Sequence, residues 1–363
     1  MNANSRLQMQ VISTGYLFVD NARFLSILSI VLFHSELFER KFTFLEGLIV
    51  QFRAFGVLTF FVITAFLMAS KFSGSGVGRL QYWKNRLDRV GKPWLVWVGI
   101  YIALDLSKLF ALHKLSLSDL PTQLFFDIFY TAYWYVPVLM FSLAVLLAFR
   151  RYWNSPGFAA VLLGVSLIHG VNQYYRWFPH THSVAFFGYL FYLWLGVRLY
   201  QNFSAVQAFI ARISWRILWG AMALAYLISV GEAQLIFRVG YQDAYNALKL
   251  SNQLYALVVL AVLIKLPLRL VPNFIQVRKE SYGIYLTHLV VASVGIGIFD
   301  LILFLFTSDK SFSFFNRLPE VVINPWERVV IWFTWFTVVY TLSLLLTKAL
   351  RQTRLAWIVG DRE

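Results

Sequence analysis

Two ionisable residues, Arg23 and His34, lie within the first long apolar stretch of the chain. If that stretch is a helix, eleven steps return the second side chain to within about 20° of the first, about 16 Å further along the axis. A neutral imidazole accepts a hydroxyl proton near neutral pH, so His34 is a candidate general base. Asp20 is a candidate partner for Arg23. The alternatives are an interfacial or Asp20-paired Arg23 and a His34 that only bonds a neighbouring helix.

A basic cluster of Lys84, Arg86, Arg89 and Lys92 follows the second apolar stretch. Arg86 and Arg89 are three residues apart, which predicts one shared face of a helix. Paired guanidinium groups bind phosphate oxygens bidentately, so the cluster is a candidate site for a phosphorylated ligand. The alternative is a cluster that binds anionic lipid headgroups.

Ser281, Tyr285 and His288 form a second candidate group. Their spacing of four and then three residues places them on one face of a late apolar helix. They are expected either to line the path of a substrate or to form a hydrogen-bonded packing face.

Metal and thiol chemistry find little support. The chain has no Cys, which excludes a thiolate metal site and a Cys nucleophile. His180 and His182 form a His-x-His pair without nearby carboxylates, and we expect no metal there.

The composition indicates the elements that position these residues. Of 363 residues, 59% are hydrophobic and 13% charged, about half the charged share of a soluble domain, and the mean hydropathy is +0.65. We therefore expect an all-α, polytopic membrane protein, with residues 1–363 forming a single transmembrane domain. Its net charge of +15 lies mainly between apolar stretches, so membrane lipids are the expected partners and nucleic acid is not. The polar start of the chain predicts no cleaved signal.

Ten apolar runs are candidate spans, since about 20 apolar residues cross a bilayer as a helix. They are Tyr16–Phe38, Leu45–Ser70, Val90–Phe110, Phe129–Phe149, Phe158–Gln173, Ser183–Tyr200, Ser214–Val230, Ser251–Leu270, Tyr282–Phe306 and Val329–Leu350. With a cytoplasmic N-terminus, this arrangement puts 20 Lys and Arg residues inside and 10 outside. The positive-inside rule then predicts that both termini are cytoplasmic, with Arg86 and Arg89 inside and His34 in the outer half.

Five segments, in order, resemble the integral-membrane acyltransferase-3 family. They are the Asp-x-x-Arg-x10-His pattern from Asp20 to His34, the Phe-Phe-Val-Ile run within Thr59–Phe66, the Arg-x-x-Arg element at Arg86–Arg89, the Trp-Tyr-Val-Pro segment from Trp134, and the Ser-Tyr-x-x-Tyr-Leu-x-His segment at Ser281–His288. Thr64-Ala65 replaces the family's Ser-Gly, which affects local packing and no charged group. A lone Arg-x10-His pattern would be weak, whereas the ordered set is specific.

The resemblance implies an O-acyltransferase of the bacterial inner membrane. It assigns His34, with Arg23 and Asp20, to catalysis, and Arg86, Arg89 and Lys92 to the donor, cytoplasmic acyl-coenzyme A. Trp134, Ser281, Tyr285 and His288 would contact the acceptor, which is expected to be a hydroxyl of an extracytoplasmic glycan or a lipid-linked sugar. Acetyl and succinyl are the candidate acyl groups, and Arg86–Pro93 looks most like the glucan-succinylating branch.

A transporter of glycans or lipids is the second hypothesis. Arg23 and His34 would then bind the substrate or relay protons. Transporters often carry Gly- or Pro-broken helices in matching positions of two halves, and no such pair recurs in this sequence.

Overall fold

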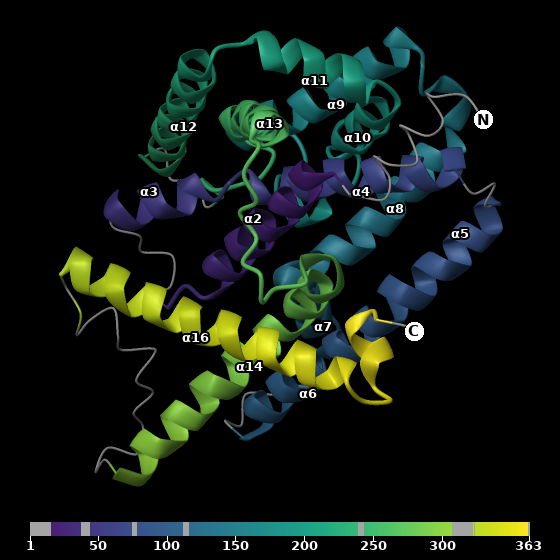
Figure 1. Cartoon of the computed structure of the whole chain (residues 1–363). Helices are drawn as coiled ribbons and strands as arrows, with labels where there is room; N and C mark the ends of the chain where they lie inside the picture. The colour runs from purple at the N-terminus through teal and green to yellow at the C-terminus, as the bar shows by residue number, and fades with distance from the viewer. Residues whose placement is uncertain are drawn as a thin grey trace.

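The computed structural model describes residues 16–37, 44–74, 78–111, 116–238, 243–306, 322 and 324–361. Every regular element in these residues is helical, which confirms the all-α class (Figure 1). The longer elements are α2 (Leu17–His34), α3 (Phe44–Phe52), α4 (Gly56–Gly74), α5 (Arg79–Arg86), α6 (Lys92–Ala111), α7 (Leu120–Phe129), α8 (Tyr135–Ala148), α9 (Pro156–Tyr175), α10 (Leu190–Gln201), α11 (Phe203–Arg212), α12 (Trp215–Arg238), α13 (Leu250–Lys265), α14 (Val277–Phe306) and α16 (Pro325–Arg351).

The helices confirm a polytopic membrane protein. By length and composition, six helical segments of the described chain can each cross a membrane, or seven if the bent pair of α7 and α8 counts as one span. The fifth, sixth and eighth expected spans correspond to α9, α10 and α13, outside that set. Of these, α10 has 12 residues and α13 has 16, fewer than the roughly 20 that cross a bilayer.

Helix α2 lies at the centre of the bundle, in contact with α4, α13, α14 and α16 (Figure 1). Small residues allow close contact with α4: a Cβ added at Gly56 would lie 2.8 Å from the Cβ of Ser29. Ala22 and Ser26 on the same helix are completely buried. In a membrane, where lipid is as apolar as leucine, such close packing is a main source of helix association. The packing therefore holds Arg23 and His34 inside the bundle.

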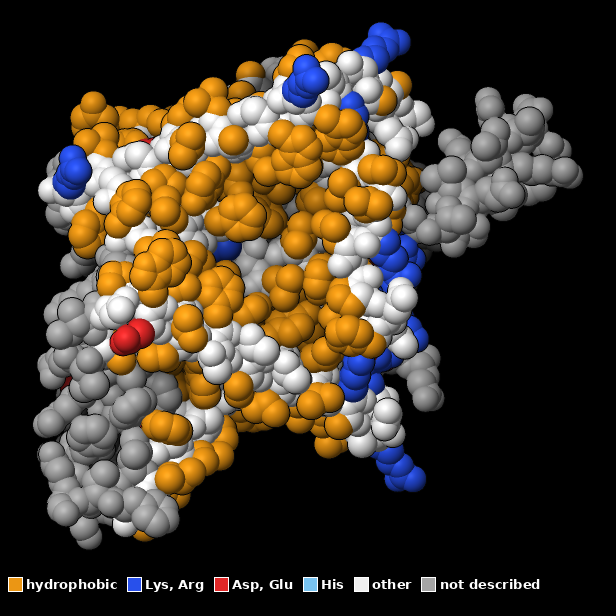
Figure 2. All heavy atoms as spheres, turned by 60° about the vertical axis from the view of Figure 1, so that its left-hand side comes forward, with side chains coloured by type: hydrophobic (Ala, Val, Ile, Leu, Met, Phe, Trp, Pro, Cys, Tyr) orange, Lys and Arg blue, Asp and Glu red, His pale blue; other side chains and the backbone are white. Residues whose placement is uncertain are grey.

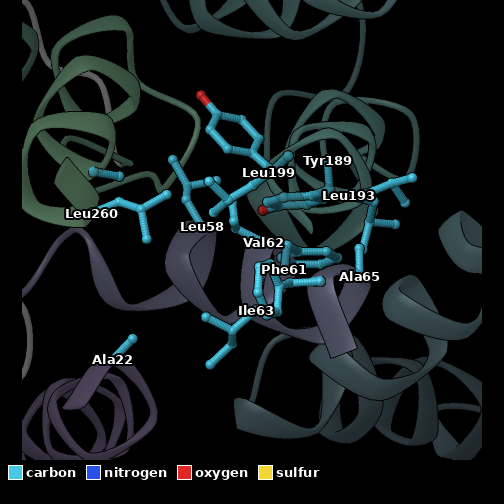
Figure 3. Close-up of a cluster of buried hydrophobic side chains, with 14 of the residues drawn as sticks. Ala22, Leu58, Phe61, Val62, Ile63, Ala65, Tyr189, Leu193, Leu199 and Leu260 are labelled. Carbon is cyan, nitrogen blue, oxygen red and sulfur yellow. The ribbon is translucent and has the colours of Figure 1, made fainter. Parts of the chain in front are cut away.

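Helices α4 and α10 form another tight interface. Figure 3 shows Leu58, Phe61 and Val62 of α4 beside Tyr189 and Leu193. The rings of Phe61 and Tyr189 stack with centroids 4.4 Å apart. A Cβ added at Gly196 of α10 would lie only 2.1 Å from the backbone oxygen of Val62, so only glycine fits this contact.

We expect Gly196→Val to destabilise the protein by about 3 kcal/mol or more. The backbones of α10 and α4 are in direct contact at this position, so no side chain fits between them. Thermal unfolding in detergent measures the effect. Gly164→Val on α9 is the matched control, since a Cβ there meets nothing within 4 Å. An equal fall in melting temperature for both variants would contradict this account of the interface.

The fourth expected span, Phe129–Phe149, starts at a break between two helices. Helix α7, which ends at Phe129, meets the segment formed by η2 (Ala132–Trp134) and α8 at an angle of 73°. Backbone inside a membrane can leave the helical form only where protein or water satisfies its polar groups. Here Tyr133 Oη donates to the backbone oxygen of Leu286, and Tyr285 Oη donates to that of Ala132 at 2.6 Å. The break is therefore held against α14.

The elements that carry the candidate site lie at two ends of the bundle. At the first, here called the Arg86 end, Asp20 of α2 bonds Arg278 of α14, and Tyr282 Oη donates to the backbone oxygen of Val90. The C-terminal turn η5 (Ala356–Val359) packs there too. The opposite end, the His34 end, contains the last turn of α2, the α3–α4 turn and the first turns of α16. Figure 2 shows an apolar face with many of its Lys and Arg side chains gathered along one edge.

Candidate functional site

The structure brings the two predicted histidines together at the His34 end. The rings of His34, the last residue of α2, and His288, in the middle of α14, have centroids 5.6 Å apart. His288 is completely buried, whereas His34 remains partly accessible. His34 was predicted as the base and His288 as a residue of the acceptor path, and the sequence had not placed them in contact.

Hydrogen bonding determines the tautomer of His288. Its Nδ1 lies 2.6 Å from the backbone oxygen of Tyr285, and because a carbonyl oxygen can only accept, Nδ1 carries the proton of a neutral ring. Nε2 is then an acceptor, and this buried atom has no hydrogen-bond partner in the described chain. His288 therefore offers a lone pair inside the protein, next to the ring of His34.

Arg23 and Arg86 lie together toward the other end. The unbroken helix α2 keeps Arg23 and His34 on one face, about 16 Å apart. Arg23 is close enough to Arg86 and Tyr135 for electrostatic interaction, and its side chain is partly accessible. Nε of Arg86 is buried without a hydrogen-bond partner in the described residues. Two neighbouring cations, one of them with an Nε that has no partner in the described residues, make this part of the bundle suitable for an anion.

The turn that carries Arg86 and Arg89 is not the α-helical turn on which the prediction of a shared face was based. The backbone from Leu87 to Gly91 forms a π-helical turn, η1, which is wider than an α-helical turn and changes the direction of the residues that follow. Arg86 is consequently half-buried, while Arg89 is exposed. Lys92 is also exposed and pairs with Asp88 at 2.6 Å. The basic cluster is thus divided into one inward guanidinium and a surface group.

The C-terminal segment covers η1. Trp97 Nε1 donates to the backbone oxygen of Ile358 at 2.9 Å. Gly360 has a φ of +78°, and a Cβ there would lie 2.7 Å from the ring of Tyr282 and 3.0 Å from the backbone oxygen of Arg89. A left-handed glycine therefore lets the chain turn tightly against the wide helical turn.

Asp20, considered as a partner of Arg23 in the alternative interpretation, is hydrogen-bonded to α14. Both oxygens of its carboxylate accept from Arg278 of α14, at 2.8 and 3.0 Å. Arg23 interacts with Asp20 electrostatically, without a hydrogen bond to it in the described structure. Asp20 therefore joins the starts of α2 and α14 and leaves the guanidinium of Arg23 available to another anion.

The remaining predicted residues surround the helix break. Trp134 is buried, with its ring 5.6 Å from that of Tyr189. Ser281 and Tyr285 are also buried, and Tyr285 packs 5.8 Å from Tyr135, between centroids. These contacts favour a packing role for Trp134 and Tyr285, while His288, on the same face of α14, meets His34.

Two further features of the His34 end had no predicted role. Glu46 and Arg328 form a buried ion pair at 3.0 Å, which joins α3 to α16. Arg53, in the α3–α4 turn, lies with its guanidinium carbon 3.5 Å from the ring centroid of Phe33. The sequence does contain an indication of a role for Arg53, because an ionisable residue within an apolar run is a candidate functional residue. In the described residues, no group of three or more His, Asp or Glu side chains could hold a metal.

Comparison with known proteins identifies the family. A family model described as an acyltransferase domain, the acyltransferase-3 model, matches residues 16–350. No curated protein and no solved structure gives a significant match. The match covers nearly the whole chain, including α2 with its Arg23 and His34, the η1 segment and α14. The chain therefore belongs to the acyltransferase-3 family of multi-pass membrane acyltransferases.

Proposed function

We propose that the protein transfers an acyl group, acetyl or succinyl, from cytoplasmic acyl-coenzyme A to a hydroxyl of an extracytoplasmic glycan or lipid-linked sugar. The observation that carries this proposal is the contact between His34 and His288, at the opposite end of α2 from Arg23. An imidazole at one end, and at the other an arginine whose Nε has no hydrogen-bond partner in the described residues, match a donor whose phosphates and thioester lie far apart.

The donor enters from the Arg86 end. Arg86 binds a phosphate of the coenzyme inside the bundle, and the exposed Arg89 and Lys92 attract the nucleotide at the surface. The pantetheine arm then follows α2 past Arg23, whose separation of about 16 Å from His34 suits a long, thin chain.

At the His34 end, the oxygen of the acceptor hydroxyl attacks the thioester carbonyl, and the imidazole of His34 takes the proton of that hydroxyl. The C–S bond breaks, and the leaving coenzyme A thiolate receives the proton from the imidazolium. His288 acts as a positioning residue: its Nε2, fixed as an acceptor by the bond from Nδ1 to Tyr285, stabilises the imidazolium of His34. The protons and electron pairs of this acyl transfer therefore balance, and no other reactant is needed.

Transport is less well supported by the geometry. Sites of that kind lie where broken helices recur in corresponding positions of two halves. The described chain has one such break, between α7 and α8, and its polar groups bond α14. A single break that is held by contacts with α14 fits a fixed active site better than a transporter whose two halves move against each other.

Sidedness and activity can be tested together in membrane vesicles. In inside-out vesicles, which expose the cytoplasmic face, added succinyl- or acetyl-coenzyme A should release free coenzyme A, and the acylated glycan should form in the lumen. Right-side-out vesicles should not consume the added donor, because the coenzyme does not cross the membrane. A reporter fused at residue 363 should be cytoplasmic in the same cells. Donor use in right-side-out vesicles alone would reverse the proposed orientation, and no donor use in either would contradict the reaction.

A further inference from the structure

Arg53 lies beside the candidate catalytic histidine without belonging to the predicted site. Its guanidinium carbon is 3.5 Å from the ring centroid of Phe33, and the centroids of Phe33 and His34 are 5.1 Å apart. Arg53 and His34 therefore both contact the ring of Phe33. Both residues lie at the end of α2 opposite Arg23.

The charge of Arg53 lacks a bonded counter-ion in the described chain. Its Nε is buried without a hydrogen-bond partner, and none of the ion pairs among the described residues includes it. Asp243 and Tyr245 are the ionisable groups near enough to attract it electrostatically. The carboxylate of Asp243 instead accepts from the side-chain amide of Asn246 at 2.8 Å.

The same end of the bundle contains a buried arginine that is paired with a carboxylate. Arg328 bonds the fully buried carboxylate of Glu46 at 3.0 Å. A buried charge left unpaired costs free energy, so an arginine kept without such a carboxylate needs another source of compensation. Beside a substrate site, that source can be an anionic group of the substrate.

The geometry of Arg53 also suits a carboxylate. One face of the guanidinium lies on the ring of Phe33, a cation–π contact that orients its plane. The N–H groups along its edge make no hydrogen bond within the described residues, and this planar fork matches the two oxygens of a carboxylate. The side chain is partly accessible, so a ligand can reach it.

We propose that Arg53 binds a carboxylate of a substrate next to His34. The carboxylate belongs either to a dicarboxylic acyl group such as succinyl or to an acidic sugar of the acceptor. This inference rests on the proposed acyl transfer. A succinyl group held with its thioester carbonyl at His34 carries its free carboxylate two methylenes further on, away from the coenzyme. Arg53 then selects which substrate reacts, while His34 provides the chemistry.

The test compares Arg53→Gln and Arg53→Lys with the wild type, in purified protein reconstituted in lipid. Succinyl- and butyryl-coenzyme A have acyl chains of equal length and differ in the terminal carboxylate. Each donor is paired with a neutral gluco-oligosaccharide and with one that contains glucuronate, and with water as the acceptor. Release of coenzyme A gives kcat/KM for each pair. Arg238→Gln, an exposed arginine at the end of α12, is the matched control.

If the acyl group supplies the carboxylate, Arg53→Gln should lower kcat/KM for succinyl-coenzyme A about tenfold to a hundredfold, with every acceptor, and leave butyryl-coenzyme A within about twofold. If the acceptor supplies it, the loss should follow the glucuronate acceptor with either donor. Arg53→Lys should lose less, because it keeps the charge without the fork. The Arg53→Lys variant alone can be used for the test if Arg53→Gln fails to fold.

Equal losses of kcat/KM for all substrate pairs would overturn the inference and make Arg53 a structural residue. An unchanged kcat/KM for all pairs would overturn it as well. A wild type that cleaves none of the donors would contradict the proposed function instead. The two failures are therefore distinct.

Discussion

His34→Ala should lower the rate of acyl transfer by about a hundredfold to ten-thousandfold, while donor binding changes little. The range is the usual contribution of a general base. His34 is the last residue of α2 and is partly accessible, so its loss removes little packing. In the proposed mechanism, donor binding depends on Arg86 and Arg23, and Arg23 lies about 16 Å from His34 along α2. Single-turnover release of coenzyme A measures the rate, and calorimetry with a non-hydrolysable analogue measures the binding.

His169→Ala is the control for losing an imidazole from another helix of the bundle. His169 lies in α9, where its ring contacts Phe178, outside the site. The control should retain near wild-type transfer. His288→Ala should have a smaller effect than His34→Ala, since it removes a group that stabilises the imidazolium. A larger loss for His288→Ala would transfer the role of base to His288, and normal turnover of His34→Ala would exclude His34 from the chemistry.

Arg86→Ala should weaken acyl-coenzyme A binding about tenfold to a hundredfold, the scale of one or two charged hydrogen bonds. The inward guanidinium has a buried Nε without a partner in the described chain, so a phosphate oxygen gains the full interaction there. Arg86→Lys should recover part of the affinity, because a point charge replaces the planar fork.

Arg89→Ala provides the matched comparison, three residues away in the same basic cluster. Arg89 is exposed, where an ion pair contributes about 1 kcal/mol or less, so the affinity should fall about fivefold at most. The effect of Arg89 should also disappear at high salt, and that of Arg86 should largely persist. Equal losses for the two variants would mean that the π-helical turn does not separate them in the bound state. Unchanged binding in both would return the cluster to a lipid-binding role.

The fold class could be predicted because it depends on local composition. Long apolar runs must form helices in a bilayer, since the backbone has no other way to satisfy its polar groups within one segment. The break near Trp134 and the short helices α10 and α13 were not predictable in this way. Hydropathy measures how apolar a segment is, whereas the length and angle of a helix depend on what packs against it.

The sequence identified most residues of the candidate site, but it predicted few of the contacts between them. Periodicity along one helix correctly placed Arg23 and His34 on one face, because α2 is unbroken. The same reasoning did not predict the π-helical turn that follows Arg86, because it assumed a regular α-helix. Whether a turn widens into η1 depends on neighbours such as Tyr282, whose hydroxyl bonds the backbone oxygen of Val90, and no local pattern encodes that contact.

The sequence by itself determined that this is a helical membrane protein of the acyltransferase-3 family, with ionisable residues at set positions within its helices. These properties follow from hydrophobicity, helical period and the order of short motifs, all of which act over a few residues. Only the tertiary structure decided that His288 meets His34, that Asp20 bonds Arg278 instead of Arg23, and that Arg53 lies beside the site without a bonded carboxylate in the described chain. Each of these depends on how distant helices pack, because close contact between side chains far apart in the chain is set by the shape of the whole bundle.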